Sequence, residues 1–321
     1  MARRGDADAV LMSILLVALL GALGTALLSA LAPHLGWLDP RPGSIPMERK
    51  SQVIPAAPVG GVVLVTIAAL GLPTALATEL TLPPLGGLTG PSLIAVLAAF
   101  VLGSLDDWLP TGLSPWSKVF GQFAASLPLL VDGGPWTVVV ALVAMNAVNT
   151  FDNSDGAAAS FGAVALLLPG PAAAGALLGF LPWNLRRGGP VLPKAYLGDA
   201  GSHAVGMLVA VHPAAWPALA LPVMDLLRVL RLRRLAGQAP WVGDRRHLPQ
   251  ALERAGLGGP ARCALIAAIA APAALASAIV ADSSMTDSGA ANSFAAVVGV
   301  VLTGAAFLGL CALIARRTEE A

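Results

Sequence analysis

The chain has 321 residues, of which 56% are hydrophobic and only 12% are charged. Soluble globular domains carry roughly 25% charged residues, so this composition excludes an ordinary soluble protein. The formal net charge of +1 leaves no basic field for binding nucleic acid. Long apolar segments instead predict an all-α polytopic integral membrane protein, with residues 1–321 forming a single transmembrane domain.

A series of apolar segments predicts the membrane helices. The first is long enough to span a bilayer and is followed by no convincing cleavage site, so we expect a helix rather than a signal peptide. Several others are short for a span of about 20 residues, and His212-Pro213 divides one pair, so about ten or eleven spans are predicted. The segments lie near residues 10–32, 59–78, 91–105, 119–131, 136–149, 157–169, 171–183, 203–211, 214–230, 261–281 and 293–315.

The distribution of Lys and Arg predicts which connectors face the cytoplasm. If the connector 33–58 is cytoplasmic, every Lys and Arg except Arg3 and Arg4 falls on the cytoplasmic side, as the positive-inside rule requires. The opposite connectors carry acidic residues and no basic one. We therefore expect a multi-pass protein of the plasma membrane with its active site facing the cytoplasm. The cytoplasmic loops would be about residues 33–58, 106–118, 150–156, 184–202 and 231–260.

Five aspartates stand at the ends of apolar segments on that predicted cytoplasmic side. They are Asp106, Asp107, Asp152, Asp155 and Asp199. A carboxylate at membrane depth is costly and usually marks a functional site. The adjacent Asp106 and Asp107 repel each other unless they share a cation or a proton, and Lys118 follows on the next segment. A surface turn or a helix cap would explain one of the two aspartates but not both.

Two further motifs surround the other aspartates. Asn149, Asp152 and Asp155 are spaced three residues apart, so they share one face if the segment is helical; a turn between two helices is the alternative. The motif Gly198-Asp199-Ala-Gly201-Ser202 begins another apolar run. Its glycines allow close approach of a ligand, and amide groups at a helix start favour anions. Asp199 would suit a magnesium ion that bridges phosphates, or act as a plain N-cap.

The predicted loop 231–260 contains the basic run Arg245-Arg246-His247. The run could contact anionic lipid headgroups or contribute to phosphate binding. Asp225 and Arg228, three residues apart near the end of a span, are equally consistent with an internal salt bridge and with a binding role.

The order of these motifs resembles the polyprenyl-phosphate N-acetylhexosamine-1-phosphate transferase family (glycosyl transferase family 4). The motifs are Asp-Pro…Arg-Lys…Pro…Gly-Gly, Asp-Asp with a following Lys, Asn-x-x-Asp-Asn-x-Asp-Gly, Leu-Pro-Trp-Asn…Gly-Asp-Ala-Gly-Ser and Asp-Arg-Arg-His-Leu, from about Asp39 to Leu257. Leu181–Asn184 and Pro222–Arg228 look closer to the undecaprenyl-phosphate GlcNAc-1-phosphate transferase branch, which starts O-antigen and teichoic acid linkages. They look less like phospho-N-acetylmuramoyl-pentapeptide transferase.

The resemblance implies a magnesium-dependent membrane enzyme, with Mn²⁺ as an alternative ion. Such an enzyme moves a sugar-1-phosphate, here expected to be N-acetylhexosamine-1-phosphate, from a UDP-sugar to undecaprenyl or another polyprenyl phosphate and releases UMP. This is the first membrane step of a cell-envelope glycan. Family members are often dimers, so a homodimer is a further expectation.

The resemblance also implies roles for individual residues. Asp199 would be the main magnesium ligand, and of Asp106 and Asp107 one would deprotonate the lipid phosphate while the other helps to hold the metal. We expect Asp107 as the second ligand. Catalytic residues would be Asp106, Asp107, Asp152 and Asp155, and substrate-binding residues would be Lys50, Lys118, Asn149, Arg245, Arg246 and His247.

Two departures from the family pattern stand out. Gln52 replaces a histidine that usually follows the Arg-Lys pair, and His247-Leu248-Pro249-Gln250 replaces a His-x-His-His pattern. We expect altered handling of the sugar donor. Two other functions are left open: a proton- or cation-coupled transporter, and a weakened, non-catalytic homologue that acts as a scaffold.

Overall fold

The computed structural model describes residues 2–38, 56–70, 88–109, 111–186, 194–282 and 289–319. Within these ranges nearly all regular structure is helical, which confirms the predicted all-α class. Two short strands, β1 and β2, pair in parallel. In chain order the elements are α1 (Ala2–Leu31), β1 (Ala56–Ala57), α2 (Gly60–Leu70), α4 (Gly90–Trp108), α5 (Pro115–Ser126), α6 (Leu129–Asp132), α7 (Gly134–Phe151), α8 (Ala157–Ala165), α9 (Pro171–Leu185), β2 (Lys194–Ala195), α10 (Gly198–Val211), the 3-10 helix η1 (Pro213–Leu219), α11 (Ala220–Leu235), α12 (Leu248–Arg254), α13 (Gly259–Asp282) and α14 (Gly289–Glu319).

Six helical segments of the described chain are long and apolar enough to cross a membrane. They are Leu11–Leu31, Gly90–Trp108, Gly134–Phe151, Pro213–Leu235, Gly259–Ala276 and Phe294–Ala315. Each of the other predicted segments also contains a helix, but a shorter one. The nine residues of α8, for example, rise only about 14 Å, whereas the hydrocarbon core is about 30 Å thick. The predicted total of ten or eleven complete crossings therefore stays a prediction.

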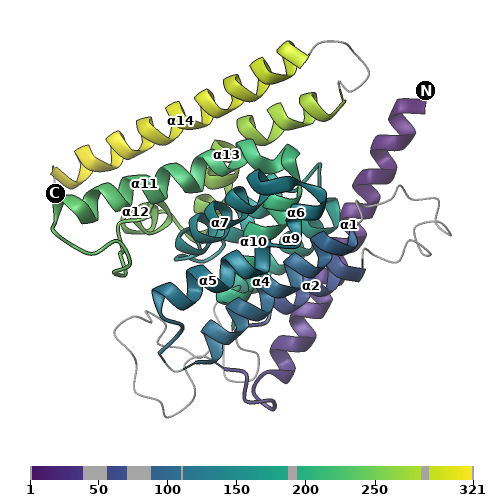
Figure 1. Cartoon of the computed structure of the whole chain (residues 1–321), viewed down its shortest axis with the longest axis horizontal. Coiled ribbons are helices and arrows are strands. Elements are labelled where there is room, and N and C mark those ends of the chain that lie inside the picture. Colours follow the sequence, from purple (N-terminus) through teal and green to yellow (C-terminus); the bar gives the residue numbers. More distant parts are fainter. Residues whose placement is uncertain are drawn as a thin grey trace.

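Helix α10 lies in the middle of the bundle and packs against α4, α7 and α2 (Figure 1). Small residues permit this close packing. A Cβ atom on Gly206 would lie 2.7 Å from the Cα of Met145 in α7, and one on Gly61 would lie 2.7 Å from the backbone nitrogen of Gly201. A Cβ on Gly103 of α4 would collide with the backbone of Asp199. Helices in membranes commonly approach each other through such small residues, and here they fix the start of α10 against α4.

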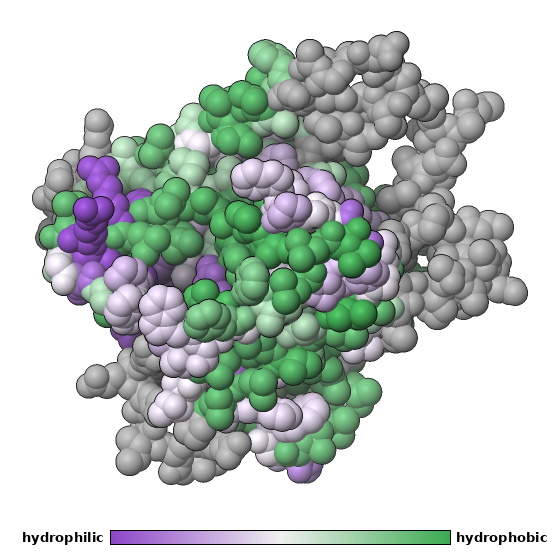
Figure 2. Space-filling view, in the orientation of Figure 1, coloured by the Kyte–Doolittle hydropathy of each residue, from purple (hydrophilic) through white to green (hydrophobic). Residues whose placement is uncertain are grey.

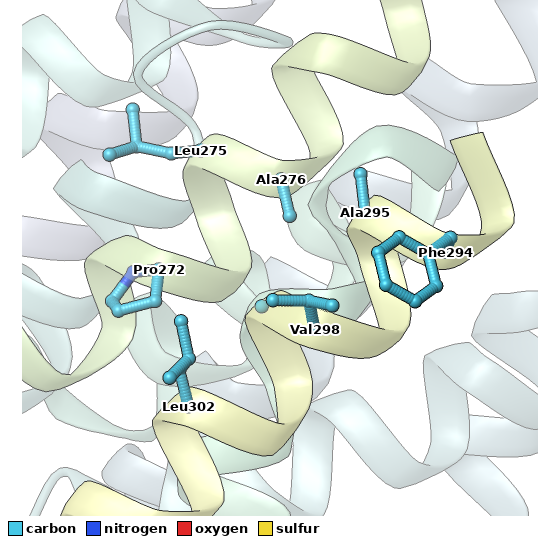
Figure 3. A pocket seen from close by; sticks show the side chains of 8 residues that line it. Pro272, Leu275, Ala276, Phe294, Ala295, Val298 and Leu302 are labelled. Atoms are coloured by element: carbon cyan, nitrogen blue, oxygen red, sulfur yellow. The ribbon is translucent and has the colours of Figure 1, made fainter. Parts of the chain in front are cut away.

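The outer helices present apolar side chains to their surroundings. Hydrophobic residues cover most of the face drawn in Figure 2, and hydrophilic side chains gather at one edge of it. A hollow of about 320 Å³ lies between α13 and α14, where Pro272, Phe294, Val298 and Leu302 are among its lining residues (Figure 3). No polar side chain lines the hollow, so it offers no partner for a phosphate or a nucleotide.

The two ends of helix α4 carry different polar groups. At its start Thr89 caps the helix by accepting a hydrogen bond from the backbone nitrogen of Ser92 at 3.2 Å, and its hydroxyl donates to Asp132. At its other end lie Asp106 and Asp107. The 19 residues of α4 separate these two ends by about 27 Å. The aspartate-rich motifs and the Thr89–Asp132 pair therefore lie at opposite ends of the bundle.

Candidate functional site

Three elements bring Asp106, Lys118 and Asp199 together. Helix α4 supplies Asp106 in its last turn, α5 supplies Lys118 in its first, and α10 supplies Asp199 in its first. The Lys118 Nζ lies 2.6 Å from Asp106 Oδ2 and 2.7 Å from Asp199 Oδ2. Burial lowers the pKa of Lys118, but the charges of Asp199 and Asp106 outweigh it and hold this pKa above its ordinary value. The ammonium therefore stays charged between two carboxylates.

Asp107 points to the backbone at the start of α10. Its Oδ1 accepts a hydrogen bond from the backbone nitrogen of Asp199 at 3.1 Å, and its Oδ2 accepts one from Ala200 at 3.0 Å. Gly198 enters the helix with φ of 72°, a conformation that side chains other than glycine rarely adopt. A Cβ there would also lie 2.6 Å from Asp107 Oδ2. In the structure Asp107 thus holds the first turn of α10, which carries Asp199.

Asn149 of α7 and His203 of α10 contact Asp199, and Gln122 of α5 in turn contacts His203. Asn149 Nδ2 donates to Asp199 Oδ1 at 2.7 Å and to Ser202 Oγ at 3.0 Å. His203 Nδ1 lies 2.7 Å from the Asp199 carbonyl oxygen and its Nε2 lies 3.0 Å from Gln122 Nε2. A carbonyl can only accept, so His203 donates from Nδ1 and accepts at Nε2.

The sequence predicted no functional role for Gln122 or His203, and Ser202 was named only as the last residue of the Gly198–Ser202 motif. A signal for Gln122 exists, because it follows Lys118 by four residues and therefore lies on the same face of α5. Ser202 and His203 follow Asp199 by three and four residues, which places them beside it on α10 in the same way.

The segment after α7 forms a tight loop. Its aspartate Asp155 pairs with Lys194 of β2, and Gly156 turns the chain with φ of 77°. Asn184 of α9 accepts a hydrogen bond from the Gly156 backbone nitrogen at 2.5 Å and donates to the Ala195 carbonyl at 2.9 Å. Asn184, which the sequence marked only as part of a family motif, therefore ties the loop to β2.

Asp152 follows α7 at its C-cap, close to the charges of the other aspartates. Burial, and then the charges of Asp199, Asp107 and Asp155, raise its pKa well above the ordinary value. Asp152 and Asp199 are thus electrostatic neighbours, although they are far apart in sequence. The protonated form of Asp152 is favoured more strongly than that of an exposed aspartate.

The basic run after α11 is held by a buried carboxylate. Asp225 Oδ2 lies 2.8 Å from His247 Nδ1, and its Oδ1 accepts hydrogen bonds from the Leu248 backbone nitrogen at 2.9 Å and from Arg228 at 2.8 Å. Asp225 is fully buried and His247 is 2% exposed. The internal salt bridge between Asp225 and Arg228, one of the two interpretations left open by the sequence, is therefore present, and it forms part of a larger anchor for the loop.

Arg245 and Arg246 of the basic run differ in their contacts and in their exposure. Arg246 lies on Asp244, with Nε to Oδ1 at 2.8 Å and Nη2 to Oδ2 at 2.6 Å. Burial raises the pKa of Asp244, but hydrogen bonds from Arg246 outweigh it and bring this pKa to about 2. Arg245 is exposed and is the more accessible of the two for a substrate. Lys50, also predicted to bind substrate, lies outside the described residues.

The acidic residues fit a divalent cation by their chemistry. Among the described residues no group of three or more His, Cys, Asp or Glu side chains has a metal-binding arrangement. Asp106 and Asp199, however, both place an oxygen against one ammonium group. Magnesium is usually held by one or two carboxylates, with water and substrate phosphates as its other ligands. Asp107, expected as the second ligand, has both oxygens engaged by the backbone of α10.

Comparisons with known proteins bear on this site. No family model matches the chain. It is 27% identical to decaprenyl-phosphate N-acetylglucosaminephosphotransferase of Mycobacterium tuberculosis, over 66% of this chain and 69% of that protein. It is also 27% identical to undecaprenyl-phosphate alpha-N-acetylglucosaminyl 1-phosphate transferase of Yersinia pestis, over 59% and 57%. The protein of that name from Escherichia coli K12 is 29% identical over 50% and 49%. The chain is therefore a homologue of the polyprenyl-phosphate N-acetylglucosamine-1-phosphate transferases.

Proposed function

We propose that the chain is a phospho-sugar transferase, which moves N-acetylhexosamine-1-phosphate from a UDP-sugar to polyprenyl phosphate and releases UMP. The observation that carries the proposal is the convergence of Asp106, Lys118 and Asp199 from three helices at one end of the bundle. The names of the homologues support transfer of a sugar phosphate to a polyprenyl phosphate. The positive-inside distribution supports a cytoplasmic active site, where sugar nucleotides are available.

The reaction requires charge neutralisation and positioning more than covalent chemistry. A phosphate oxygen of the lipid attacks the β-phosphorus of the UDP-sugar. The bond from that phosphorus to the bridging oxygen breaks, and UMP leaves with the electron pair. Lys118 would contact the phosphate oxygens. Asp106, whose carboxylate pairs with Lys118, would accept a proton from the lipid phosphate, and Asp107 would act by holding Asp199 in position.

A bound magnesium ion would neutralise charge on the phosphates. Asp199 and Asp106 are the residues that would hold it, and Mn²⁺ satisfies the same oxygen donors. Asn149 fixes the orientation of the Asp199 carboxylate through its hydrogen bond at 2.7 Å. We expect Asp152 and Asp155 to border the nucleotide.

The surroundings of Lys118 suit a lipid substrate. Trp116 and Phe120 lie two residues before and after it on α5, which turns them to the other side of the helix, and their ring centroids are 6.4 Å apart. Trp108 is the last residue of α4. These three aromatic side chains are 66% to 70% exposed. Aromatic residues gather where a bilayer meets water. The site therefore lies beside a surface that can meet the lipid phosphate at the membrane boundary.

The proposal is tested by measuring UMP released by detergent-purified protein. The reaction contains undecaprenyl phosphate, Mg²⁺ and one of UDP-GlcNAc, UDP-GalNAc or UDP-MurNAc-pentapeptide, with EDTA and lipid-free controls. We expect release that needs both metal and lipid and that occurs with an N-acetylhexosamine donor. No release with any donor, from protein that unfolds cooperatively on heating, would contradict the proposal.

A further inference from the structure

Asn153 in the loop after α7 contacts Gln250 of α12, and each of them carries a side-chain amide. Asn153 Nδ2 donates to the Thr150 carbonyl at 2.6 Å, and Gln250 Nε2 lies 3.3 Å from the Asn153 carbonyl, to which it donates. A backbone carbonyl only accepts, so these contacts fix which end of each amide is nitrogen. Ser154 Oγ, 2.6 Å from Glu253 Oε2, adds a second link between loop and helix.

The remaining amide oxygens have no donors. Asn153 Oδ1 and Gln250 Oε1 are both buried and make no hydrogen bond. More than nine in ten buried polar groups in proteins are satisfied, and an exception calls for an explanation such as a ligand or water. Because Gln250 bonds the Asn153 backbone, the same loop–helix contact carries two buried acceptors that donor groups can satisfy.

Both residues belong to segments that the sequence placed among the predicted cytoplasmic loops of the site. Asn153 stands between Asp152 and Asp155, and the position of Gln250 is fixed by the anchor three residues earlier, where Asp225 holds His247 at 2.8 Å. Each carbonyl-type oxygen repels a phosphate oxygen and attracts an O–H or N–H group. The His-x-His-His pattern of the family has a histidine at the position of Gln250. A histidine there could donate a hydrogen bond to a phosphate. The glutamine directs its amide nitrogen to the Asn153 backbone carbonyl and leaves its oxygen as a buried acceptor without a partner.

We propose that Asn153 Oδ1 and Gln250 Oε1 form a neutral acceptor subsite that binds hydroxyl or amide N–H groups of the sugar nucleotide rather than its diphosphate. This inference rests on the proposed function. The donor belongs either to the sugar, through its hydroxyl and acetamido groups, or to the uracil ring. Both sources offer the same kind of hydrogen-bond donor. UDP alone carries the uracil ring but not the sugar, so it can supply the contact only if the uracil is the source.

The test is isothermal titration of detergent-purified full-length protein with UDP-GlcNAc and, separately, with UDP, both in the presence of Mg²⁺. The variants are Gln250→Leu and Asn153→Ala, and the matched control is Gln238→Leu, an exposed glutamine in the same cytoplasmic segment. Loss of one hydrogen bond of ordinary strength predicts roughly tenfold weaker binding of UDP-GlcNAc in each variant. The control should bind as the wild type does.

The two ligands separate the sources. If UDP binding is unchanged while UDP-GlcNAc binding weakens, the subsite holds the sugar, and if both weaken, it holds the uracil. UDP-GlcNAc binding at wild-type strength in both variants would overturn the subsite but leave the proposed function intact. Wild-type protein that neither binds UDP-GlcNAc nor releases UMP would overturn the proposed function, and the subsite with it. Thermal unfolding confirms folding, and Asn153→Ala tests the same pair if Gln250→Leu does not fold.

Discussion

The carboxylates of Asp106 and Asp199 both contact the ammonium group of Lys118, and this contact stabilises their negative charges. Two like charges this close are unstable without a cation between them. Lys118 supplies the cation in the structure, at 2.6 and 2.7 Å from the two carboxylates. A bound divalent cation could take over part of the same task. A substitution of Lys118 therefore measures how much the stability of the site depends on positive charge.

We expect Lys118→Met to lower the free energy of unfolding by roughly 3 kcal/mol, because it leaves two partly buried carboxylates facing each other. Mg²⁺ should recover part of the loss by binding in place of the ammonium. Thermal unfolding in detergent, with and without Mg²⁺, measures both effects. Lys194→Met is the matched control and should cost less, because its partner Asp155 is 41% exposed and water can solvate the freed carboxylate. Equal losses in the two variants would contradict this reasoning.

The sequence predicted which carboxylates gather but not what each one contacts. Asp106, Asp152 and Asp199 could be grouped because each ends an apolar segment on one predicted face. The capping role of Asp107 could not be predicted, since it depends on a contact with Asp199, which is 92 positions away. The burial of His247 against Asp225 could not be predicted either. It depends on a tertiary contact, whereas a basic run in a loop by itself predicts exposed side chains.

At the scale of elements, α10 is placed by backbone contacts that only glycine allows. Gly103 of α4 lies against the peptide that joins Asp199 and Ala200, beside the hydrogen bonds from Asp107. A larger residue there must push the two helices apart. The sequence predicted a helix at each apolar segment that the structure describes, because hydrophobic runs are a local signal. The runs also predicted that several of these helices are short, but not how α4, α7 and α2 pack around α10.

Gly103→Ala should therefore reduce transfer and lower the unfolding temperature, because its Cβ collides with the backbone of α10. The matched control is Gly309→Ala in α14, where a Cβ would meet nothing within 4 Å. Alanine is the better helix former by about 1 kcal/mol, so the control should be neutral or slightly stabilising. Thermal unfolding and product formation are measured together. An unchanged Gly103→Ala protein would rule out this contact as the determinant of α10's position.

The loop after α11 depends on Asp225 in a similar way. Asp225→Ala leaves the Leu248 amide and the His247 ring without their buried acceptor, at a cost of about 1–3 kcal/mol for each unsatisfied group. We expect trypsin to cleave after Arg245 and Arg246 faster in this variant than in the wild type. Asp132→Ala, which removes a carboxylate at the opposite end of the bundle, should leave the cleavage rate unchanged. Equal rates in all three proteins would show that Asp225 does not hold the loop.

At the scale of the whole molecule, the charged motifs occupy one end of the bundle and the Thr89–Asp132 pair the other. The sequence predicts that the first end is cytoplasmic. Topology can be tested with single cysteines in a background that lacks Cys263 and Cys311. Cysteine at Asp132 should react with an impermeant maleimide in intact cells, whereas cysteine at Arg245 should react only after permeabilisation. Labelling of residue 245 from outside would reverse the predicted orientation.

The most direct measurement compares Asp199→Asn with Asp132→Asn in the formation of sugar-diphosphate lipid from a labelled UDP-sugar and polyprenyl phosphate. The two substitutions make the same chemical change at opposite ends of the bundle. If Asp199 holds charge at the reacting phosphates, product formation should fall by about 100-fold or more in Asp199→Asn and stay at the wild-type rate in Asp132→Asn. Wild-type product formation by a folded Asp199→Asn protein would contradict a catalytic site at this carboxylate cluster.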